Sequence, residues 1–561
     1  MQLPFRRALV VLVLIGLVVM FGCQPEAEEE TPAAEEEAPA EEEAPGEEIR
    51  IIVDGISQEP NVLNPILAPS MTFQVGVNEV MFPGLFKITP GGSIIPHVAE
   101  SVPTVENGLI TEGGLTYTVP LREDVTWSDG TPFTSADVMF SWEMIMHPDV
   151  VARTVVGFDM IESIDTPDEY TVVFHLEDVY PGFLSVWADP TIIPKHVWED
   201  VPPEEIMESP MNVEPEVTLG PFTFKEWVAG DHIRVVRDPE YFGTPAGVDE
   251  IVFRVIEDQN ALLVAILRGD INIWYYAPVT HVPTLEADPD TELAWMDVPV
   301  WWEHATLNLR NPMLEDVRVR QALNYAVDQE LLIDSVWSGC AVTQNSPIPQ
   351  GSWAHCDELP HYPHDLEKAA ELLEEAGWVE GADGRRTRDG EVLQLVYSTT
   401  AGNPWREQTQ RIVQDLCGQV GVELVIRNVD GATFFGTLFP GQLTGPDGGW
   451  DMAQYQTAAT WDPAVGLDRL FHSRMVESQV GNRGGYVNPA VDQLLDQVSV
   501  MVDPDERMPL FSELASILRD EAPVLYLYTP WEANAVRGVR GFAPTPWSVW
   551  TWNVEEWELI E

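Results

Sequence analysis

The sequence predicts an α/β fold whose strands and helices alternate irregularly over residues 49–561. Three stretches carry this prediction. Residues 115–145 have the pattern of a strand, a turn and a capped helix, residues 392–429 that of a strand, a helix and a strand, and residues 505–530 that of an amphipathic helix followed by an aromatic strand. Strands that alternate with helices are typical of α/β folds. The absence of a fixed-period repeat argues against a solenoid or a propeller.

The first stretch begins with polar and apolar residues that alternate over residues 115–121, which is the period of a half-buried strand. Residues 128–130, Ser-Asp-Gly, then predict a tight turn. Thr134 is placed to cap the helix that follows, with Asp137 three residues further on. Upstream of this stretch, "IRIIVDG" predicts a short buried strand that opens the body.

The later part of the chain contains further amphipathic helices. Asp365 can cap a helix whose apolar residues recur every three or four positions, and Gly377 stands where a helix commonly ends. The segments "VLQLVYST", "REQTQRIVQDLCGQVG" and "VELVIRNV" predict a strand, a helix and a strand. The last long helix ends at Pro523, just before the predicted strand "VLYLYTP".

The N-terminus has the order of a bacterial secretory leader. Arg6 and Arg7 precede an apolar run over residues 8–21, which is shorter than the ~20 residues that a membrane-spanning helix needs. "VVMFGC" resembles a lipobox, so we expect residues 1–22 to be a lipoprotein signal peptide and Cys23 to receive lipid. The alternative is an ordinary signal sequence with an incidental cysteine.

Residues 23–48 are predicted to be a disordered, lipid-anchored acidic linker. Between residues 24 and 48 the chain has twelve glutamates and almost nothing that can be buried. Such a segment does not offset its own ordering entropy, and its like charges keep it extended. An acidic interaction tail is the alternative.

The body that follows is strongly acidic. Twelve of the 92 acidic residues and two of the 29 basic residues lie before residue 49, so the body carries 80 acids and 27 bases. Nucleic acid is excluded as a partner because it requires a basic footprint. No second apolar run is long enough to span a membrane, and the length suggests two or three domains.

Three cysteines remain in the body: Cys340, Cys356 and Cys417. In an exported protein an odd number allows one internal disulfide and leaves one thiol. Cys340 and Cys356 flank a loop rich in Pro, Ser and Gly, so we predict that they pair. The rival is a metal site in "HCDELPHYPH", but its spacing matches no standard zinc pattern. We therefore expect no metal and no cofactor.

Several motifs together resemble one protein family. They include "EPNVLNP", "GLTYTVPLREDVTWSDGTPFTSADVMFSW", "LGPFTFKEW", "LRGDIN", "VRVRQALNYAVDQELLI" and "DLEKAAELLEEAGW", which follow one another in this family's order. The body is thereby similar, over nearly all of residues 49–561, to the family 5 extracellular solute-binding proteins, the dipeptide, oligopeptide and nickel binders of ABC importers.

This resemblance implies a two-lobed periplasmic-binding-protein-like fold of class II type, large, with an extra subdomain in the first lobe and two crossovers between the lobes. It places the first lobe at residues 49–305, the second at residues 306–524 and a return to the first lobe at residues 525–561. Ligand is enclosed when the two lobes close like a hinge.

A ligand buried between lobes needs aromatic walls and a few fixed polar groups. Near the first crossover the candidates are Trp301, Trp302, Asn308 and Arg310, although one tryptophan of the adjacent pair could pack in the core.

In the second lobe the resemblance points to Trp405 and Arg406, because similar peptide binders hold a ligand carboxylate with an arginine in this neighbourhood. "YQTAATWDPAVG" adds Trp461 and Asp462. Peptide-binding relatives carry an aspartate for the peptide α-ammonium where this chain has Ala459. A free peptide amine would lack its charge-assisted hydrogen bond there, unless Asp451 or Asp462 took over the role.

The resulting functional hypothesis is a monomeric, extracytoplasmic, lipid-anchored binding protein that delivers peptides to the transmembrane permease subunits of an ABC importer. An oligosaccharide is the alternative, since 20 tryptophans offer flat rings for sugar faces, and a nickel chelate is another. The rival of another class is an extracellular hydrolase, but no G-x-S-x-G, H-E-x-x-H or P-loop motif occurs, so we expect no enzymatic activity.

Overall fold

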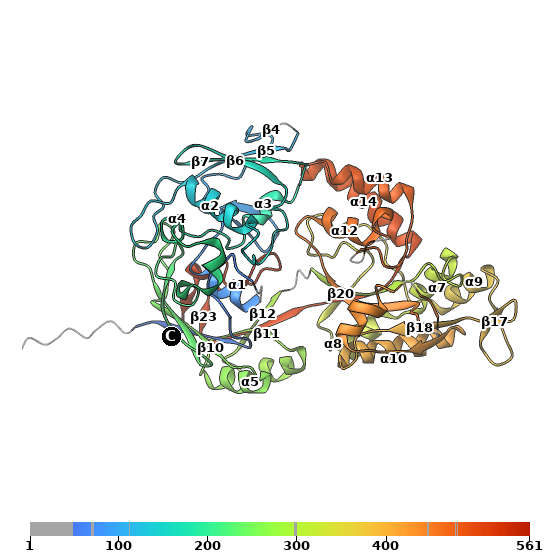
Figure 1. The fold of residues 1–561 in the computed structure, drawn as a ribbon. Coiled ribbons are helices and arrows are strands. Elements are labelled where there is room, and N and C mark those ends of the chain that lie inside the picture. Colours follow the sequence, from blue (N-terminus) through green and yellow to red (C-terminus); the bar gives the residue numbers. More distant parts are fainter. Residues whose placement is uncertain are drawn as a thin grey trace, which may run out of the picture. The chain divides into compact units, whose positions relative to one another are not determined.

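Two mixed sheets organise the body in the computed structural model, which describes residues 49–68, 72–111, 113–296, 300–441, 443–445, 448–476, 478 and 481–560. Figure 1 shows these sheets in different halves of the body. The predicted signal peptide and acidic linker, Cys23 included, lie outside the described residues. None of the helices in the described ranges is long and apolar enough to cross a bilayer.

The first sheet has seven strands within the described residues, in the order β12-β22-β11-β1-β10-β9-β8. Their bounds are β1 (Ile51–Ile56), β8 (Phe222–Val228), β9 (His232–Arg237), β10 (Glu250–Val255), β11 (Ile273–Ala277), β12 (Glu292–Met296) and β22 (Glu532–Val536). Strand β1 runs parallel to both of its neighbours, β10 and β11. The opening strand predicted from the sequence is therefore central to this sheet.

Both faces of the first sheet are covered. In β11, Ile273 and Tyr275 pack into the large cluster that also holds Trp550, whereas Trp274 packs with Leu262 of helix α5 (Gln259–Arg268) on the other face. Successive side chains of a strand point to opposite faces, so alternate residues enter different clusters. Helix α1 (Thr72–Glu79) contributes to the large cluster.

The second sheet has six strands among the described residues, in the order β14-β21-β13-β20-β18-β19. Their bounds are β13 (Trp301–Leu307), β14 (Ala341–Thr343), β18 (Gln394–Ser398), β19 (Glu423–Ile426), β20 (Met452–Ala458) and β21 (Val524–Pro530). In β21, Leu525 and Leu527 enter one cluster, and Val524 and Tyr526 enter another. This sheet, too, is buried on both faces.

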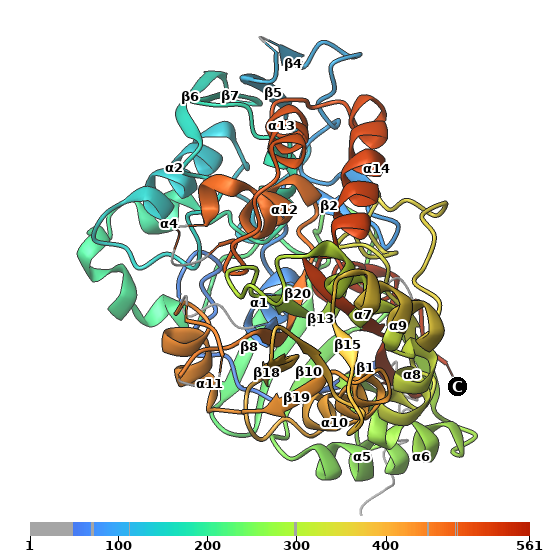
Figure 2. The ribbon, with the colours of Figure 1, turned by 90° about the vertical axis from the view of Figure 1, so that its right-hand side faces the viewer.

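Helices cover each of these faces (Figure 2). On one face pack α7 (Val317–Ala326), α8 (Gln329–Trp337), α9 (Leu366–Glu375) and α10 (Pro404–Gln419). On the other pack α12 (Pro463–Phe471), α13 (Pro489–Val498) and α14 (Pro504–Glu521). The predicted cap of α9 is confirmed, because an Asp365 carboxylate oxygen accepts a hydrogen bond from the Lys368 N–H at 2.8 Å.

A subdomain of the first lobe holds the predicted strand, turn and helix. Its four-stranded sheet has the order β4-β5-β7-β6 within the described residues. The elements are β4 (Ile110–Thr111), β5 (Thr116–Pro120), β6 (Ile161–Asp168), β7 (Thr171–Leu176) and α2 (Ser135–Met146). The Thr134 N–H donates to the Asp137 carboxylate at 2.9 Å, so the predicted capping pair forms.

Short elements complete the described fold. They are β2 (Phe86–Ile88), β3 (Ile94–Pro96), β15 (Val379–Glu380), β16 (Arg386–Arg388), β17 (Glu391–Val392), β23 (Val539–Arg540), β24 (Glu558–Leu559), α3 (Phe183–Val186), α4 (Lys195–Trp198), α6 (Val282–Glu286) and α11 (Gly431–Thr433).

The chain passes between the two sheets twice. Strand β12 ends at Met296 and β13 begins at Trp301, while β21 ends at Pro530 and β22 begins at Glu532. The sequence-based boundaries assigned residues 301–305 and 525–530 to the first lobe, but these residues pair within the second sheet. We therefore propose that one crossover lies between Met296 and Trp301 and the other at residue 531, because a strand belongs to the lobe whose sheet it extends.

We expect Asp54 of β1 to make the stability of the first lobe depend on pH. Its side chain is fully buried, and one carboxyl oxygen accepts a hydrogen bond from the Trp550 indole N–H at 2.7 Å. Burial raises the pKa of Asp54 to about 7, and the Trp550 hydrogen bond lowers it by less. The native state therefore keeps this proton up to about pH 7, whereas an unfolded aspartate loses it near pH ~4.

Because the native state binds the extra proton, its stability should fall as the pH rises through about 7. We expect the unfolding free energy of wild type to change with pH by on the order of a few kcal/mol more than that of Asp54→Asn. The asparagine keeps an acceptor for Trp550 but does not titrate. Thermal unfolding from pH 5 to 8 at fixed ionic strength measures this difference. Parallel stability curves for the two proteins would contradict this assignment.

Candidate functional site

Two neighbouring cavities lie where the crossovers connect the lobes. The first, which we call the Trp301 cavity, has a volume of about 390 Å³. It is lined by Ser57, Gln58, Thr72, Phe73, Gln259, Tyr275, Tyr276, Met296, Trp301, Glu532, Thr545, Pro546 and Ser548. Ser57 and Gln58 directly follow β1, and Tyr276 lies at the end of β11. In α/β sheets the carboxyl ends of parallel strands are the usual place for a ligand.

The second, the Trp405 cavity, has a volume of about 220 Å³ and shares Tyr276 and Glu532 with the first. It is lined by Tyr276, Ala277, Pro278, Val279, Thr280, Glu303, Trp337, Trp405, Gln456, Pro530, Trp531, Glu532 and Ala533. The lining combines residues after β11 of the first lobe with residues of β13, β20 and α10 of the second. A solute here would therefore contact both lobes.

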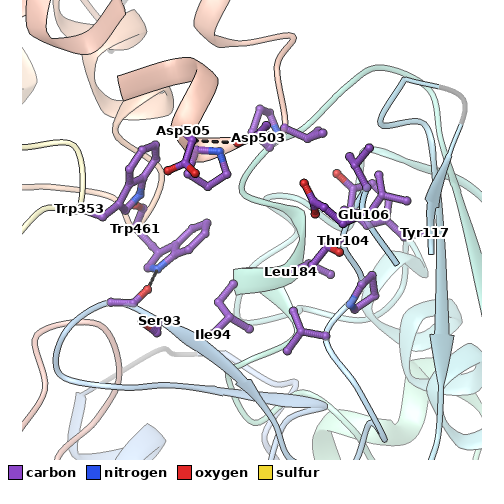
Figure 3. A pocket seen from close by; sticks show the side chains of 18 residues that line it. Ser93, Ile94, Thr104, Glu106, Tyr117, Leu184, Trp353, Trp461, Asp503 and Asp505 are labelled. Atoms are coloured by element: carbon purple, nitrogen blue, oxygen red, sulfur yellow. Dashed lines mark hydrogen bonds between the residues drawn. The ribbon is translucent and has the colours of Figure 1, made fainter. Parts of the chain in front are cut away.

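A third cavity, the outer cavity, has a volume of about 500 Å³ and lies between the subdomain and the second lobe (Figure 3). Tyr117, Glu106 and Leu184 face it from the first lobe, and Trp353, Trp461, Asp503 and Asp505 face it from the second. The Trp461 indole N–H donates to the Gly92 carbonyl at 2.8 Å, which joins the two lobes beside this cavity. Trp353 in turn donates to the Trp461 carbonyl at 2.9 Å.

The adjacent tryptophans of β13 have different environments. Trp301 is 39% exposed and lines the Trp301 cavity, whereas Trp302 is 1% exposed and stacks on His304 with 4.0 Å between ring centroids. Strand alternation explains the difference, because residues 301 and 303 point to one face and residues 302 and 304 to the other. The alternative that one tryptophan of the pair packs in the core is therefore confirmed for Trp302.

Trp405 and Arg406 begin helix α10. Trp405 is 40% exposed in the Trp405 cavity and lies 5.9 Å from Trp337 between ring centroids. The Arg406 Nε donates to a carboxylate oxygen of Glu303 at 2.8 Å, and its Nη1 donates to the Thr400 hydroxyl at 3.1 Å. Burial raises the pKa of the Glu303 carboxyl, and Arg406 opposes this shift. A ligand carboxylate would have to compete with Glu303 for this arginine.

Asp462 forms a buried ion pair. Its two carboxylate oxygens accept hydrogen bonds from the Arg507 guanidinium at 2.6 and 2.7 Å, and both side chains are 2% exposed. One of these oxygens also accepts the Ala464 N–H at 2.9 Å, which caps α12. These contacts give Asp462 a structural role in the second lobe.

Asn308 and Arg310 also have structural partners. The buried Asn308 amide donates to the Trp450 carbonyl at 3.0 Å, and Arg310 donates to the Arg483 carbonyl at 2.8 Å. Neither residue lines one of the three cavities. The structure thus places Trp301 and Trp405 in two cavities that share Tyr276 and Glu532, pairs Arg406 with Glu303, and places the other predicted ligand residues elsewhere.

The comparison with known proteins decides the family. The sequence profile of the bacterial extracellular solute-binding proteins, family 5 Middle, matches residues 93–477. The chain belongs to this family. Its members are substrate-binding proteins of ABC transporters, so the predicted family and the two-lobed α/β fold are confirmed.

Named family 5 relatives match almost the whole chain. The oligopeptide-binding protein AppA of Bacillus subtilis is 26% identical over 521 residues, which cover 91% of this chain and 92% of AppA. A solved structure of AppA with a nonapeptide superposes with a TM-score of 0.67 at 24% identity and covers 91% of this chain and 100% of that one. NikZ of Campylobacter jejuni, solved with Ni(L-His), gives 0.70 at 25% identity, with 91% and 99% covered.

The two cavities at the crossovers contain residues that sequence reasoning did not identify. Tyr276 and Glu532 line both cavities at the crossovers, and Gln456 and Trp531 line the Trp405 cavity. The aromatic segments "IWYYAP" and "YTPWEANAV" were visible in the sequence, but no spacing rule connects them. Ala459, where peptide-binding relatives were expected to carry an aspartate, borders a void of about 20 Å³.

The predicted disulfide between Cys340 and Cys356 is not formed, because both residues and Cys417 are free. The Cys340 carbonyl accepts a hydrogen bond from the Trp531 N–H at 3.0 Å, near the second crossover. Cys356 instead packs against the cluster under α12, α13 and α14.

Proposed function

We propose that this family 5 protein captures peptides in the Trp301 and Trp405 cavities and delivers them to the permease of an ABC importer. The observation that carries the proposal is the composition of the cavity walls, to which both lobes contribute. A solute bound there would favour the closed arrangement, since it contacts both lobes only when they meet.

The cavities have the character of a small-ligand site. Their volumes of about 390 and 220 Å³ are of the order found for ligand pockets, and four of the thirteen residues that line each cavity are aromatic. Gln456, Gln58 and Ser57 supply amide and hydroxyl groups that can hydrogen-bond a peptide backbone. The printed names of relatives, an oligopeptide-binding protein among them, support the choice of peptide.

The location follows from the N-terminus. We propose that Cys23 carries the lipid and that residues 24–48 hold the binding body away from the membrane. The composition of this segment, twelve glutamates and almost nothing that can be buried, supports a linker.

Native mass spectrometry of freshly purified protein tests the choice of ligand. We expect additional masses that correspond to short peptides of mixed sequence, and these should disappear after partial unfolding and refolding. A ladder of hexose spacings would replace peptide by oligosaccharide. A single mass with a nickel isotope pattern would replace it by a nickel chelate.

A further inference from the structure

We propose that Glu532 and Tyr276 bind an ammonium group of the captured solute in the wall that the Trp301 and Trp405 cavities share. The inference rests on the proposed function in one respect, that the solute occupies these cavities. It adds the chemical class of the group that is recognised, a cation with N–H donors.

Glu532 is a buried carboxylate with one unused oxygen. The residue is 9% exposed, and it lines both cavities. One carboxylate oxygen accepts the hydroxyl hydrogen of Tyr276. The other, Oε2, has no hydrogen-bond partner in the part of the chain that the structure describes, and no described Lys, Arg or His forms an ion pair with this carboxylate. Burial alone raises the pKa of Glu532 to about 7, with the Tyr276 hydrogen bond as the opposing effect.

An unpaired carboxylate is costly in such a place. A largely buried charge is stabilised by a counter-charge or by hydrogen-bond donors. A ligand ammonium at Oε2 would supply both a positive charge and N–H donors. Glu532 therefore has the properties of a group that is completed by its ligand.

Tyr276 is held toward the cavities by its backbone. Its φ of +66° is left-handed, and it lies where the pairing of β11 with β22 shifts between Trp274 and Ala277. The Asn534 side-chain oxygen accepts the Tyr276 N–H at 3.0 Å and fixes this conformation. A tyrosine in this region is strained, and such backbone strain is concentrated at functional sites. The residue remains 44% exposed and lines both cavities, so a solute can contact it.

The remaining walls favour a cation as well. No lysine, arginine or histidine is among the lining residues of either cavity. The other lining carboxylate, Glu303, is already paired with Arg406 at 2.8 Å. Aromatic faces attract cations, and Tyr275, Trp301 and Trp405 supply such faces around the shared wall. A ligand carboxylate would be repelled from this wall by Glu532.

This assignment also addresses the missing carboxylate at position 459. Ala459 lies at the end of β20, where its N–H donates to the Val300 carbonyl at 2.8 Å, next to the first crossover. Strand β20 pairs with β13 so that Ala458 lies opposite Trp301, which lines the Trp301 cavity. A peptide near this end of β20 would reach Glu532, which lies at the second crossover. The anchoring carboxylate would thus come from the first lobe instead of the second.

Calorimetric titration of wild type and Glu532→Gln tests the inference with trialanine, N-acetyl-trialanine and n-butylammonium as probes. We expect wild type to bind trialanine about 10- to 100-fold more tightly than its acetylated form, as a charge-assisted hydrogen bond implies. Glu532→Gln should remove this preference while keeping the melting temperature, and Tyr276→Phe should reduce it. Glu257→Gln, which changes the same charge in an exposed loop outside all three cavities, should behave as wild type.

The outcomes separate the inference from the proposed function. If wild type binds both peptides equally, or if Glu532→Gln keeps the preference, the ammonium assignment is overturned while peptide capture stands. If neither peptide binds, peptide capture is overturned and n-butylammonium decides the assignment. Binding of n-butylammonium that is lost in Glu532→Gln supports an ammonium site, and binding that is absent or unaffected overturns it.

Discussion

Asp462→Ala is expected to lower the free energy of unfolding by about 3–5 kcal/mol, because it leaves the Arg507 guanidinium buried without its counter-charge. Both partners are 2% exposed, and their two hydrogen bonds measure 2.6 and 2.7 Å. The cap of α12 is lost in the same substitution. Chemical denaturation followed by tryptophan fluorescence measures the change.

Asp124→Ala is the matched control for this prediction. Asp124 also pairs with an arginine, Arg122, but its side chain is 66% exposed, so its loss should cost less than about 1 kcal/mol. If Asp462→Ala kept the wild-type stability and lost affinity for the captured solute, Asp462 would be a ligand residue after all.

Arg406→Met is expected to have an effect of similar size, about 3–5 kcal/mol, since it leaves Glu303 buried without a cation. Glu303 is 5% exposed and has the Gln454 amide, at 3.0 Å, as its other side-chain donor. Its pKa, already raised by burial, should rise further once Arg406 no longer opposes the shift. Denaturation at pH 7 measures the loss of stability.

A double substitution tests whether the loss of stability in Arg406→Met comes from the unpaired charge of Glu303. Glu303→Gln combined with Arg406→Met should recover part of the stability that Arg406→Met loses, because no buried charge then lacks a partner. The contrary result would be wild-type stability in Arg406→Met with a large loss of peptide affinity. It would mean that Arg406 holds a ligand carboxylate, as the resemblance to peptide binders implied.

Local sequence patterns were sufficient to predict many elements. The alternation over residues 115–121 became β5, and the pair Thr134 and Asp137 begins α2. The capping Asp365 and the predicted strand after Pro523 are also confirmed. These signals are local, since each depends on residues within a few positions of one another.

The site itself depends on contacts between distant segments. Tyr276 and Glu532 are 256 residues apart, and Arg406 and Glu303 are 103 apart. Tyr276 has a left-handed backbone where the pairing of β11 with β22 shifts. No residue type in this segment indicates that shift. For the same reason the sequence indicated Arg406 as a ligand group, although the fold supplies a carboxylate that pairs with it.

The sheet that a crossover strand joins is likewise determined by tertiary contacts. The sequence predicted a strand at 524–530 without showing which sheet it extends, and it did not predict the strand at 301–307. In the structure both strands pair with each other and join the second sheet. This arrangement places Trp301 and Glu303 at the crossovers, beside Glu532 of the first lobe.

Binding of solute at the crossovers between the lobes is the basis of the proposed function. Its most direct test is a crystal structure of the protein with the solute that it retains through purification. We predict that the electron density of this solute lies between Trp301, Trp405 and Glu532. Density in the outer cavity, between Trp461 and Tyr117, with solvent alone in the Trp301 and Trp405 cavities, would contradict the claim.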